Sequence, residues 1–383
     1  MNATDFTTGF PGILVPSPLG TDAFVPVPLP VNLQITAKIQ HANERALVAL
    51  GALGAVIATL PNPELIMRRE AVHSSKIEGT QTELAGLLVF EEVITGTDEG
   101  GRSVLLDNDA REVHNYVKAQ EYGLAELKNL PVCTRLIKDM HARLMDGVGD
   151  DRGFYVRPGA YRDSQAFMGS TDIKHARYVA PPSDRIDALM DDLEKYINSP
   201  SEYPTLVDTA LIHYQFEAIH PFADGNGRLG RLLITLLLAA RGTLSQPILY
   251  LSAYFERKKA EYVNRMWRIS CAGEWEEWIM FFLEGVRTEA DDIASRARGL
   301  LTLREAYRAQ LQKDRAAKQL ALLDALFRWP IITVNRAAQL LGMTHQGATK
   351  HVRSLQEKGI LREVTGNERN RMYIARGVIE LLS

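Results

Sequence analysis

The stretch His220-Pro221-Phe222-Ala223-Asp224-Gly225-Asn226-Gly227-Arg228-Leu229-Gly230-Arg231 holds the densest set of polar functions in this 383-residue chain. Apolar residues at helical spacing come before it and after it. Because glycine weakens a helix, we expect a turn over residues 224–227 between two core helices. The residues that set this pattern are Val207, Leu211, Tyr214 and Ala218 before the turn, and Leu229, Leu232, Leu233, Leu236, Leu237 and Ala240 after it.

The residues of this turn suit a ligand that carries phosphate. The first N–H groups of a helix have no partner inside it and its dipole favours anions. Arg228 and Arg231 share a helix face, and arginine forks match phosphate oxygens. Asp224 is a hard carboxylate of the kind that holds Mg²⁺ against phosphates. His220 is a candidate general base, because histidine ionises near neutral pH. These residues predict phosphoryl-group chemistry but leave the transferred group open.

No competing nucleotide-binding or metal motif occurs in the sequence. There is no G-x-x-x-x-G-K-[S/T] loop and no strand–G-x-G-x-x-G–helix unit. The two cysteines, Cys133 and Cys271, are far apart and belong to no zinc-ligand pattern.

The stretch resembles the signature H-x-F-x-[D/E]-G-N-G-R-x-x-R of the Fic family (filamentation induced by cAMP) at every defining position. The resemblance implies a mainly α protein with a Fic-type helical core and a short β-hairpin flap. It also implies transfer of AMP from ATP to a Ser, Thr or Tyr hydroxyl of a target protein, with release of pyrophosphate. His220 would be the catalytic base, and Asp224 would hold Mg²⁺. ATP phosphates would be bound by Gly225, Asn226, Gly227, Arg228, Leu229, Gly230 and Arg231, the last of these on the γ-phosphate.

A second segment, Ser74 to Gly79, has the spacing of a helix end, and an exposed helix end would explain it equally well from spacing alone. It also resembles the inhibitory motif [S/T]-x-x-x-E-[G/N] of Fic proteins, with Ser74, Glu78 and Gly79 at the defining positions. In that family the glutamate pairs with the second arginine of the signature, here Arg231. The resemblance therefore implies autoinhibition. In some relatives the same glutamate supports removal of AMP instead, and the sequence leaves this open.

Two short apolar runs in residues 157–182 flank a polar tip and predict a two-stranded hairpin. In Fic proteins a hairpin here is the flap, which holds a target segment as an added strand. We assign Met168, Gly169 and Val179 to it. Tyr262, in an aromatic helical region, is our expectation for the adenine contact.

The composition is that of an ordinary globular protein, with 46% apolar and 24% charged residues and a net charge of −3. The longest apolar run, residues 46–60, is too short for a membrane span. The first residues lack the pattern of a signal peptide. We therefore expect a cytoplasmic protein without membrane contact.

The last part of the chain changes character. Residues 316–383 contain ten Lys and Arg against five Asp and Glu, a balance of +5. The order of predicted elements resembles a winged helix-turn-helix domain. Thr333 is expected to cap a first helix, and Gly342 to end it near Ala338, Leu340 and Leu341. Ala348, Val352 and Leu355 are expected to face inward on the second helix, and Gly366-Asn367 to turn a hairpin, the wing.

This domain could bind DNA or dock a protein, and the sequence leaves both open. DNA would meet the outward residues of the second helix and the wing, namely His345, Gln346, Thr349, Lys350, Arg353, Arg369 and Arg371. We divide the chain into an N-terminal region with the inhibitory helix (1–110), a catalytic core (111–290), a connecting helix (291–315) and the winged-helix domain (316–383).

The sequence is compatible with three functions. The first is an autoinhibited protein adenylyltransferase that uses ATP and Mg²⁺, and it is favoured because a base stands at His220. The second is a nucleotide-sensing, DNA-binding transcription regulator, and the third is a Fic enzyme that removes AMP or transfers another phosphate-linked group. Self-modification and a homodimer are left open as well.

Overall fold

The computed structural model describes residues 1, 3–95, 107–148, 157–244, 246, 248–311, 317–366 and 371–382. The chain divides into two compact units. Unit 1 is Met1–Gly51 with Asn115–Ala290, and unit 2 is Ala52–His114 with Asp291–Ser383. The division falls within three helices, which are α1 (Ala37–Ile57), α4 (Asn108–Glu126) and α11 (Trp275–Leu311).

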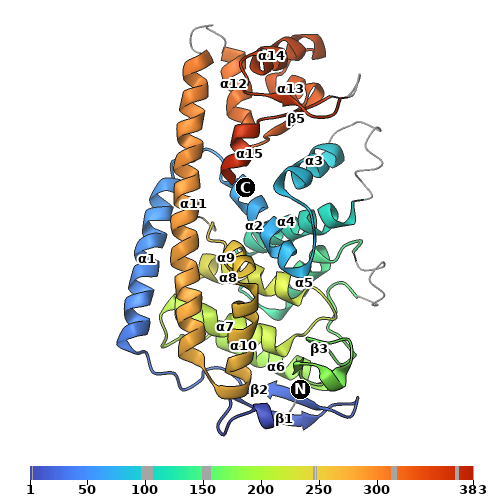
Figure 1. Ribbon diagram of the computed structural model, residues 1–383, viewed down its shortest axis with the longest axis vertical. Helices are drawn as coiled ribbons and strands as arrows, with labels where there is room; N and C mark the ends of the chain where they lie inside the picture. The colour runs from blue at the N-terminus through green and yellow to red at the C-terminus, as the bar shows by residue number, and fades with distance from the viewer. Residues whose placement is uncertain are drawn as a thin grey trace. The chain divides into compact units, whose positions relative to one another are not determined.

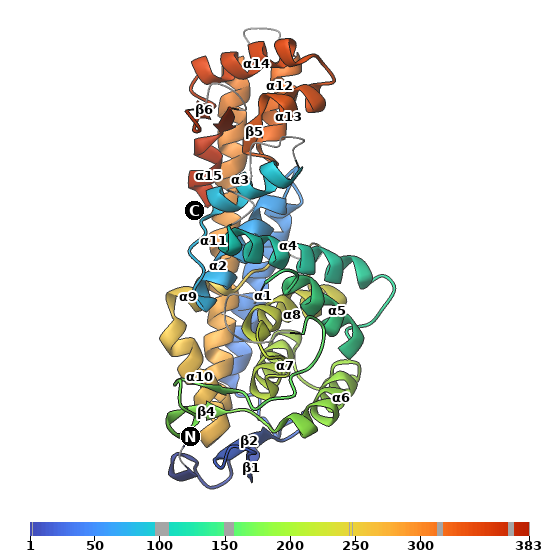
Figure 2. The same ribbon diagram turned by 90° about the vertical axis from the view of Figure 1, so that its right-hand side faces the viewer.

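Unit 1 is built around two helices that lie side by side, α7 and α8 (Figures 1 and 2). Their sequences are apolar on nearly every side, so both are buried almost throughout and form the core of the unit. The remaining helices pack outside this pair. The helices of unit 1, besides those that cross the division, are η1 (Ala3–Asp5), α5 (Thr134–Leu144), η5 (Ile173–His175), η6 (Ser183–Arg185), α6 (Ile186–Ile197), α7 (Thr205–Ile219), α8 (Asn226–Ala240), α9 (Ser252–Arg257) and α10 (Lys259–Ala272).

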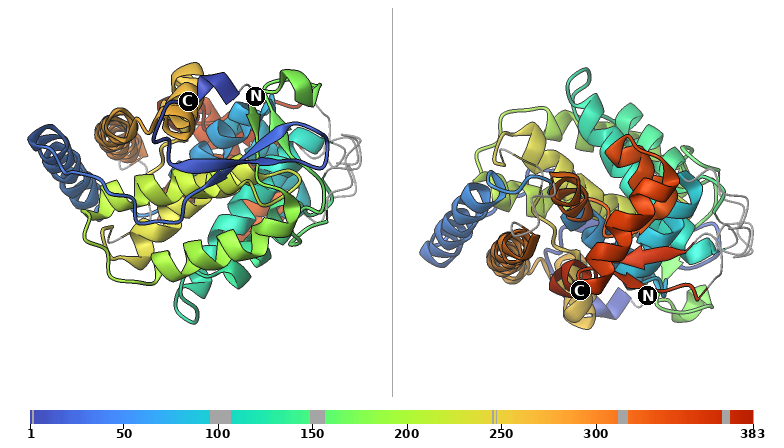
Figure 3. Two further views of the ribbon diagram at one scale, coloured as in Figure 1. Left: turned by 90° about the horizontal axis from the view of Figure 1, so that it is seen from below. Right: turned by 90° about the horizontal axis from the view of Figure 1, so that it is seen from above.

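Two antiparallel hairpins complete the described part of unit 1. The first, β1 (Gly12–Pro16) with β2 (Asp22–Pro26), lies across α7 (Figure 3). Its presence was not predicted, because the prolines of residues 1–35 obscure the alternation of a strand. The second, β3 (Phe167–Met168) with β4 (Tyr178–Val179), pairs Phe167 with Val179 and Met168 with Tyr178, which confirms the predicted hairpin.

Unit 2 combines two helices from the first third of the chain with a C-terminal module. The early helices are α2 (Glu64–Glu78) and α3 (Leu84–Thr95). In the module, α12, α13 and α14 pack on one another beside a three-stranded antiparallel sheet of order β5-β7-β6 (Figure 2). Its elements are α12 (Ala317–Leu326), β5 (Ile331–Thr333), α13 (Val334–Leu341), α14 (His345–Glu357), β6 (Arg362–Glu363), β7 (Met372–Ile374) and α15 (Arg376–Leu382).

Helix ends in the C-terminal module follow the sequence closely. The hydroxyl of Thr333 accepts the N–H of Arg336 and caps α13, and Gly342 ends that helix with a left-handed backbone. Ala348, Val352 and Leu355 of α14 are buried, which confirms their inward assignment. Asn367 and Arg369 lie outside the described residues.

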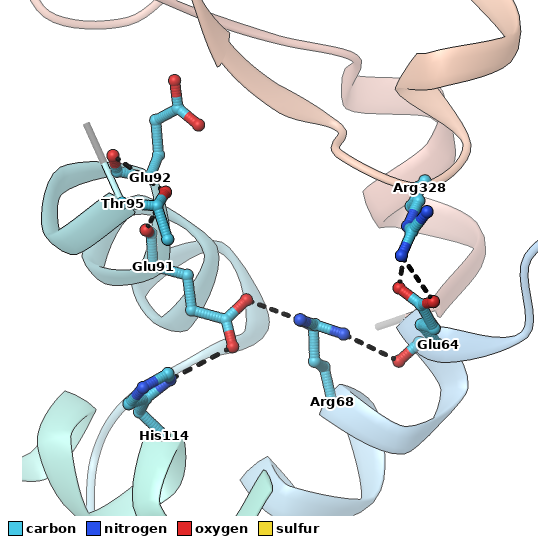
Figure 4. Close-up of polar contacts among 7 residues, drawn as sticks. All are labelled: Glu64, Arg68, Glu91, Glu92, Thr95, His114 and Arg328. Carbon is cyan, nitrogen blue, oxygen red and sulfur yellow. Dashed lines mark hydrogen bonds and ion pairs between the residues drawn. The ribbon is translucent and has the colours of Figure 1, made fainter. Parts of the chain in front are cut away.

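A chain of polar contacts joins the elements of unit 2 (Figure 4). Arg328, after α12, forms an ion pair with Glu64 at the start of α2, with nitrogen–oxygen distances of 3.0 and 2.9 Å. Arg68 of α2 donates to the carboxylate of Glu91 at 2.6 Å, and His114 lies 3.3 Å from the same carboxylate. Burial opposes the charge on Glu91, yet the bond with His114 and the charge of Arg68 lower its pKa.

Two element bounds differ from those read in the sequence. The helix that contains residue 291, α11, starts earlier, at Trp275, and runs on to Leu311. The turn does not extend to Gly227, because α8 begins at Asn226, so Asn226 and Gly227 form its first turn. The mainly helical class with a few small sheets is confirmed. Across the described ranges, no helix is both long enough and apolar enough to cross a membrane.

Candidate active site

Residues 220–225 connect α7 to α8, and we call this connection the hinge. His220, its first residue, has a backbone conformation that is uncommon for its residue type. Its φ is 50°, and it is the one non-glycine with positive φ among the described residues. This left-handed residue ends α7, and its N–H still donates to the carbonyl oxygen of Phe216 at 3.0 Å. Its ring Nδ1 lies 3.4 Å from the carbonyl oxygen of Glu217, which can only accept a hydrogen bond. With the proton on Nδ1, the ring keeps its basic lone pair on Nε2.

The turn after His220 is fixed by Asn226. The side-chain oxygen of Asn226 accepts the N–H of Phe222 at 2.9 Å, and its nitrogen donates to the carbonyl oxygen of Phe222 at 2.8 Å. Phe222 itself is fully buried. The Asn226 side chain therefore shapes the turn, and its backbone N–H lies in the first turn of α8, where N–H groups have no partner inside the helix.

His141 of α5 holds the next part of the turn, and the sequence reading missed it. Its Nδ1 accepts the N–H of Gly159 at 2.9 Å, so its Nε2 carries the proton and donates to the carbonyl oxygen of Asp224 at 3.0 Å. Its ring stacks on Phe222 with centroids 3.8 Å apart. Burial lowers the pKa of His141 to about 4, so the ring is neutral at physiological pH.

Gly225 has no side chain because His141, Leu144 and Met145 leave no room for one. A Cβ on Gly225 would lie 2.9 Å from the sulfur of Met145 and 3.5 Å from Nε2 of His141. Gly225 also has a φ of 80°, which favours glycine. Both constraints bring the backbone before α8 into the tight turn that the sequence predicted.

The carboxylate of Asp224 is partly exposed at the mouth of this turn. Its Oδ1 accepts the N–H of Gly225 at 2.6 Å and lies 3.3 Å from Nη2 of Arg228, whose side chain is fully buried. Among the described residues no cluster of three or more His, Cys, Asp or Glu could hold a metal. A single carboxylate fits Mg²⁺ that arrives with phosphate oxygens, because Mg²⁺ takes few protein ligands in such sites.

Leu229, Gly230 and Arg231 continue α8 inside the core. Leu229 is fully buried and the side chain of Arg231 is 3% exposed. A Cβ on Gly230 would lie 2.3 Å from Oε1 of Glu217 and 3.3 Å from the ring of Phe216, so a larger residue here would displace the Glu217 side chain. The carbonyl oxygen of Gly230 accepts Nδ1–H of His213 at 3.1 Å.

The side chain of Tyr262 is buried. Its hydroxyl donates to Nε2 of His213 at 2.7 Å, and its ring stacks on Phe255 with centroids 4.3 Å apart. The Tyr262 side chain is 2% exposed. Its contact with adenine stays a prediction, and the structure links it to the α8 backbone through His213.

A pocket with a volume of about 130 Å³ lies between α10, the helix that contains Tyr262, and the hairpin of β3 and β4. Met168, Gly169 and Tyr178 of the hairpin line one side, and Val263 and Trp267 of α10 line another. Arg177 donates to the side-chain oxygen of Asn264 at 2.6 Å and so links the hairpin to α10. The remaining lining residues are Arg177, Tyr214, Glu217, Ala218, Met266 and Ser270.

The hairpin rests on apolar contacts. Val179 is fully buried in a small cluster with Ala23 and Ala176. Gly169 has a φ of 90°, and a Cβ there would lie 2.9 Å from the Cβ of Arg177. Tyr178 donates its hydroxyl to the carbonyl oxygen of Ala218 in α7 at 2.7 Å. These contacts fix the hairpin against the helix that ends at His220.

Arg162 is a further residue that the sequence reading missed. It precedes β3, is 4% exposed, and donates to three backbone carbonyl oxygens, one of which belongs to His220. Burial lowers the pKa of Arg162 to about 10, which leaves it charged at neutral pH. A PGAYR segment gives no signal by itself that its arginine turns inward.

The second motif lies in unit 2, at the end of α2. Ser74 is fully buried, whereas Glu78 and Gly79 are exposed. Gly79 has a φ of 107° and its N–H donates to the carbonyl oxygen of Lys76, so it ends the helix as predicted.

Comparison with known proteins agrees with this architecture. The Fic/DOC family model matches residues 131–238, which include the whole hinge, and the model of the Fic/DOC family N-terminal region matches residues 40–125. Together these segments cover about half of the chain. The chain belongs to the Fic/DOC family.

Curated relatives carry the same family name. The chain is 30% identical to the "Protein adenylyltransferase Fic" of Drosophila willistoni over 225 residues, which cover 55% of this chain and 41% of that protein. It is 27% identical to the protein of the same name from Aedes aegypti over 224 residues, covering 55% of this chain and 42% of the relative. The chain thus spans about two fifths of the length of these relatives.

A solved structure shares the fold. The crystal structure of a Fic family protein from Desulfovibrio desulfuricans G20 aligns with a TM-score of 0.56 at 20% identity, covering 91% of this chain and 98% of that one.

Proposed function

We propose that this chain is a protein adenylyltransferase, which transfers AMP from ATP to a hydroxyl side chain of a protein. The observation that carries the proposal is the α7–α8 hinge. It presents a basic ring nitrogen of His220, the carboxylate of Asp224 and the N-terminus of α8 within one short, rigid turn. The likeness to relatives named protein adenylyltransferases supports AMP as the transferred group.

In the proposed reaction, ATP phosphates bind at the start of α8. The backbone N–H groups of Asn226 and Gly227 and the dipole of α8 favour their negative charge. Arg228 and Arg231 supply positive charge from the same helix. Mg²⁺, held by Asp224 and phosphate oxygens, would neutralise charge on the phosphates.

His220 then acts as the general base. Its Nε2 takes the proton of the acceptor hydroxyl as the hydroxyl oxygen bonds to the α-phosphorus of ATP. The bond between the α-phosphorus and the bridging oxygen breaks, and pyrophosphate leaves with that oxygen. The AMP group stays on the acceptor oxygen. The base and the phosphate-binding turn belong to one rigid element, so they need little reorganisation between binding and reaction.

The hairpin and its pocket supply the rest of the proposed site. The apolar pocket with Trp267 and Tyr178 suits a planar ring such as adenine. A target segment would add to the hairpin of β3 and β4 as a further strand, which holds an acceptor hydroxyl by main-chain bonds. The acceptor is a protein, and the chain itself is included in this proposal.

We propose further that Glu78 restrains this activity. The support is the match of Ser74, Glu78 and Gly79 to the inhibitory motif and the helix end that these residues form. The resemblance pairs Glu78 with Arg231, which would keep the γ-phosphate from that arginine. The same glutamate would serve an AMP-removing reaction, and that reaction is the alternative outcome of the test below.

The test is a mass measurement on the intact chain. Wild type, Glu78→Gly and His220→Ala are incubated with ATP and Mg²⁺, alone and with a candidate target protein. A gain of one AMP group that is larger in Glu78→Gly and absent in His220→Ala supports both proposals. Loss of AMP from a modified target, dependent on Glu78, would favour removal as the activity.

A second function is favoured by α14. Gln346, Lys350 and Arg353 are exposed along one side of this helix, which follows a tight turn after α13. The order α12, β5, α13, α14, β6, β7 fits a winged helix, and residues 316–383 carry ten basic against five acidic residues. We therefore propose that this module, within the boundaries inferred from the sequence, binds duplex DNA through α14.

A further inference from the structure

Arg162 joins the two parts of the candidate site through backbone contacts alone. Its Nε donates to the carbonyl oxygen of His220 at 2.8 Å. Its Nη1 donates to the carbonyl oxygen of Ser164 at 2.7 Å and its Nη2 to that of Pro181 at 2.6 Å. In addition, its backbone N–H donates to the carbonyl oxygen of Pro221 at 2.9 Å.

We propose that Arg162 is a positioning residue that fixes the distance between the base His220 and the hairpin that holds the acceptor. The proposal rests on the function proposed above. Ser164 stands three residues before β3 and Pro181 two residues after β4, so one guanidinium holds both ends of the hairpin. The same guanidinium holds the residue that carries the base.

The backbone of His220 shows why such a clamp is needed. A left-handed conformation is unfavourable for a residue with a Cβ, and it persists only where its surroundings impose it. Arg162 binds the carbonyl oxygen of His220, which belongs to one of the two peptide groups that define this conformation, and the carbonyl oxygen of Pro221 in the peptide group that follows. The ring direction of His220 depends on that backbone.

Further bonds join the two sides of the hairpin next to the carbonyl groups that Arg162 binds. Ala180 donates its N–H to the carbonyl oxygen of Ala166 at 3.0 Å, and Gln165 donates its side-chain N–H to the carbonyl oxygen of Ala180 at 2.6 Å. Loss of the guanidinium would loosen this end of the hairpin together with His220. A displacement of about 1 Å between reacting groups costs about 10²-fold in rate.

The three acceptors require the fork of an arginine. Lysine would keep the charge, but it has a single nitrogen at the end of its chain. It therefore cannot donate to His220, Ser164 and Pro181 from three separate atoms. The phosphate-binding turn does not depend on Arg162, because Asn226 and His141 hold it. The proposal thus separates the rate of transfer from the binding of ATP.

The test uses the full chain with Arg162→Met and Arg162→Lys. The matched control is Arg143→Met. Like Arg162, Arg143 donates to a backbone carbonyl oxygen, that of Asp139, and its guanidinium stacks on the ring of Tyr122. These contacts lie outside the hairpin and the hinge. Three quantities are measured. They are the dissociation constant of MgATP, the rate of AMP incorporation at saturating ATP, and hydrogen exchange of the amides of His220 and Ala180.

We expect both Arg162 variants to bind MgATP as wild type does. Arg162→Met should incorporate AMP about 10²-fold more slowly, with Arg162→Lys restoring only part of the rate. The His220 and Ala180 amides should exchange faster in both variants and at the wild-type rate in Arg143→Met. If Arg162→Met does not fold, Arg162→Lys carries the same comparison.

Unchanged exchange at His220 and Ala180 would overturn the proposal, and so would a loss of ATP binding that accounts for the slower rate. If the wild-type chain incorporates no AMP, the proposed function fails, and hydrogen exchange still decides whether Arg162 couples the hinge to the hairpin.

Discussion

The side-chain amide of Asn226 bonds to both the N–H and the carbonyl oxygen of Phe222, at 2.9 and 2.8 Å. A side-chain amide has an acceptor oxygen and a donor NH2 group, and this pair of bonds directs both groups to a single backbone residue. Because Phe222 and Asn226 are buried, no water can replace these bonds. These bonds therefore fix Phe222, which follows His220 and Pro221, to the first turn of α8.

The first prediction concerns Asn226→Ala. It leaves the buried N–H and carbonyl group of Phe222 without their partner, at a cost of about 1–3 kcal/mol in the free energy of unfolding. We expect MgATP affinity to fall as well, because the turn that we propose to bind phosphate loosens. Urea unfolding and calorimetric titration with MgATP measure the two effects.

The control is Asn198→Ala, because the Asn198 side chain also makes two bonds to backbone carbonyl groups, those of Val132 and Glu194, at 2.9 Å each. It should lose stability while MgATP affinity stays as in wild type. Equal losses of affinity in the two variants would mean that general loosening, not the turn, controls binding.

The second prediction concerns pH. Burial lowers the pKa of His141 to about 4 and that of His213 to about 3, below the ordinary value of 6.5. The unfolded chain therefore binds more protons than the folded chain between these values and 6.5. Stability must rise with pH in this window and must not change above it on account of these groups.

Replacing His141 with glutamine should lower the slope of unfolding free energy against pH by up to about 1.4 kcal/mol per pH unit, with the largest change midway between pH 4 and pH 6.5. Urea unfolding at several pH values measures it. The control is His175→Gln, because the His175 side chain is 78% exposed. If the His141 variant keeps the wild-type slope, the ring is not held neutral by burial.

The third prediction concerns Glu92 of α3, whose carboxylate accepts the N–H of Thr333 at 3.0 Å and its hydroxyl at 2.9 Å (Figure 4 shows Glu92 on its helix). Burial raises the pKa of Glu92 even though these bonds oppose the shift. Glu92→Ala removes both bonds at the start of α13, and should cost about 1–3 kcal/mol in unfolding free energy.

Glu92→Gln keeps an acceptor oxygen and should retain most of this stability, which urea unfolding can compare directly. Thr95→Ala is the control on the same helix, since it removes bonds to the backbone carbonyl oxygens of Glu91 and Glu92, at 2.7 and 3.4 Å, and leaves the Glu92 carboxylate in place. Equal unfolding free energies for Glu92→Ala and Thr95→Ala would contradict the assigned role.

The fourth prediction tests the C-terminal module. A fluorescent DNA duplex should bind the chain with an affinity that falls steeply with salt. Lys350→Ala and Arg353→Ala should each weaken binding and reduce the salt slope by about 0.9 for each phosphate that the variant no longer neutralises. Fluorescence anisotropy at several salt concentrations measures both.

Arg376→Ala is the matched control for these variants, because Arg376 is exposed in the same module but pairs with Glu380 on α15. It should bind DNA as wild type does. If Lys350→Ala and Arg353→Ala bind the duplex with wild-type affinity, DNA binding through α14 is contradicted, and docking of a protein becomes the favoured role of this module.

The sequence predicted those parts of the fold that depend on local pattern. The helices on either side of the hinge follow from apolar spacing, and the ends at Gly79 and Gly342 follow from glycine's left-handed conformation. The hairpin of β1 and β2 was missed, because its stability comes from contacts with distant segments such as α7 and β4. Strand formation depends more on such context than helix formation does.

In the candidate site, too, the sequence predicted what depends on local pattern and missed what depends on contacts between distant residues. The residues of the hinge stand together in the sequence, so their spacing was enough to find them. His141 and Arg162 were missed because they reach the hinge from positions 83 and 58 residues distant from their acceptors. A single sequence gives no sign that a histidine on an apolar helix face, or an arginine after a proline turn, bonds to a remote backbone.

The most direct test of AMP transfer is to compare ATP labelled at the α-phosphate with ATP labelled at the γ-phosphate. Wild type, Glu78→Gly and His220→Ala are each incubated with Mg²⁺ and one form of labelled ATP. The account predicts protein-bound label from the α position only, stronger in Glu78→Gly and absent in His220→Ala. Protein-bound label from the γ position would contradict it, because it would mean that phosphate, not AMP, is transferred.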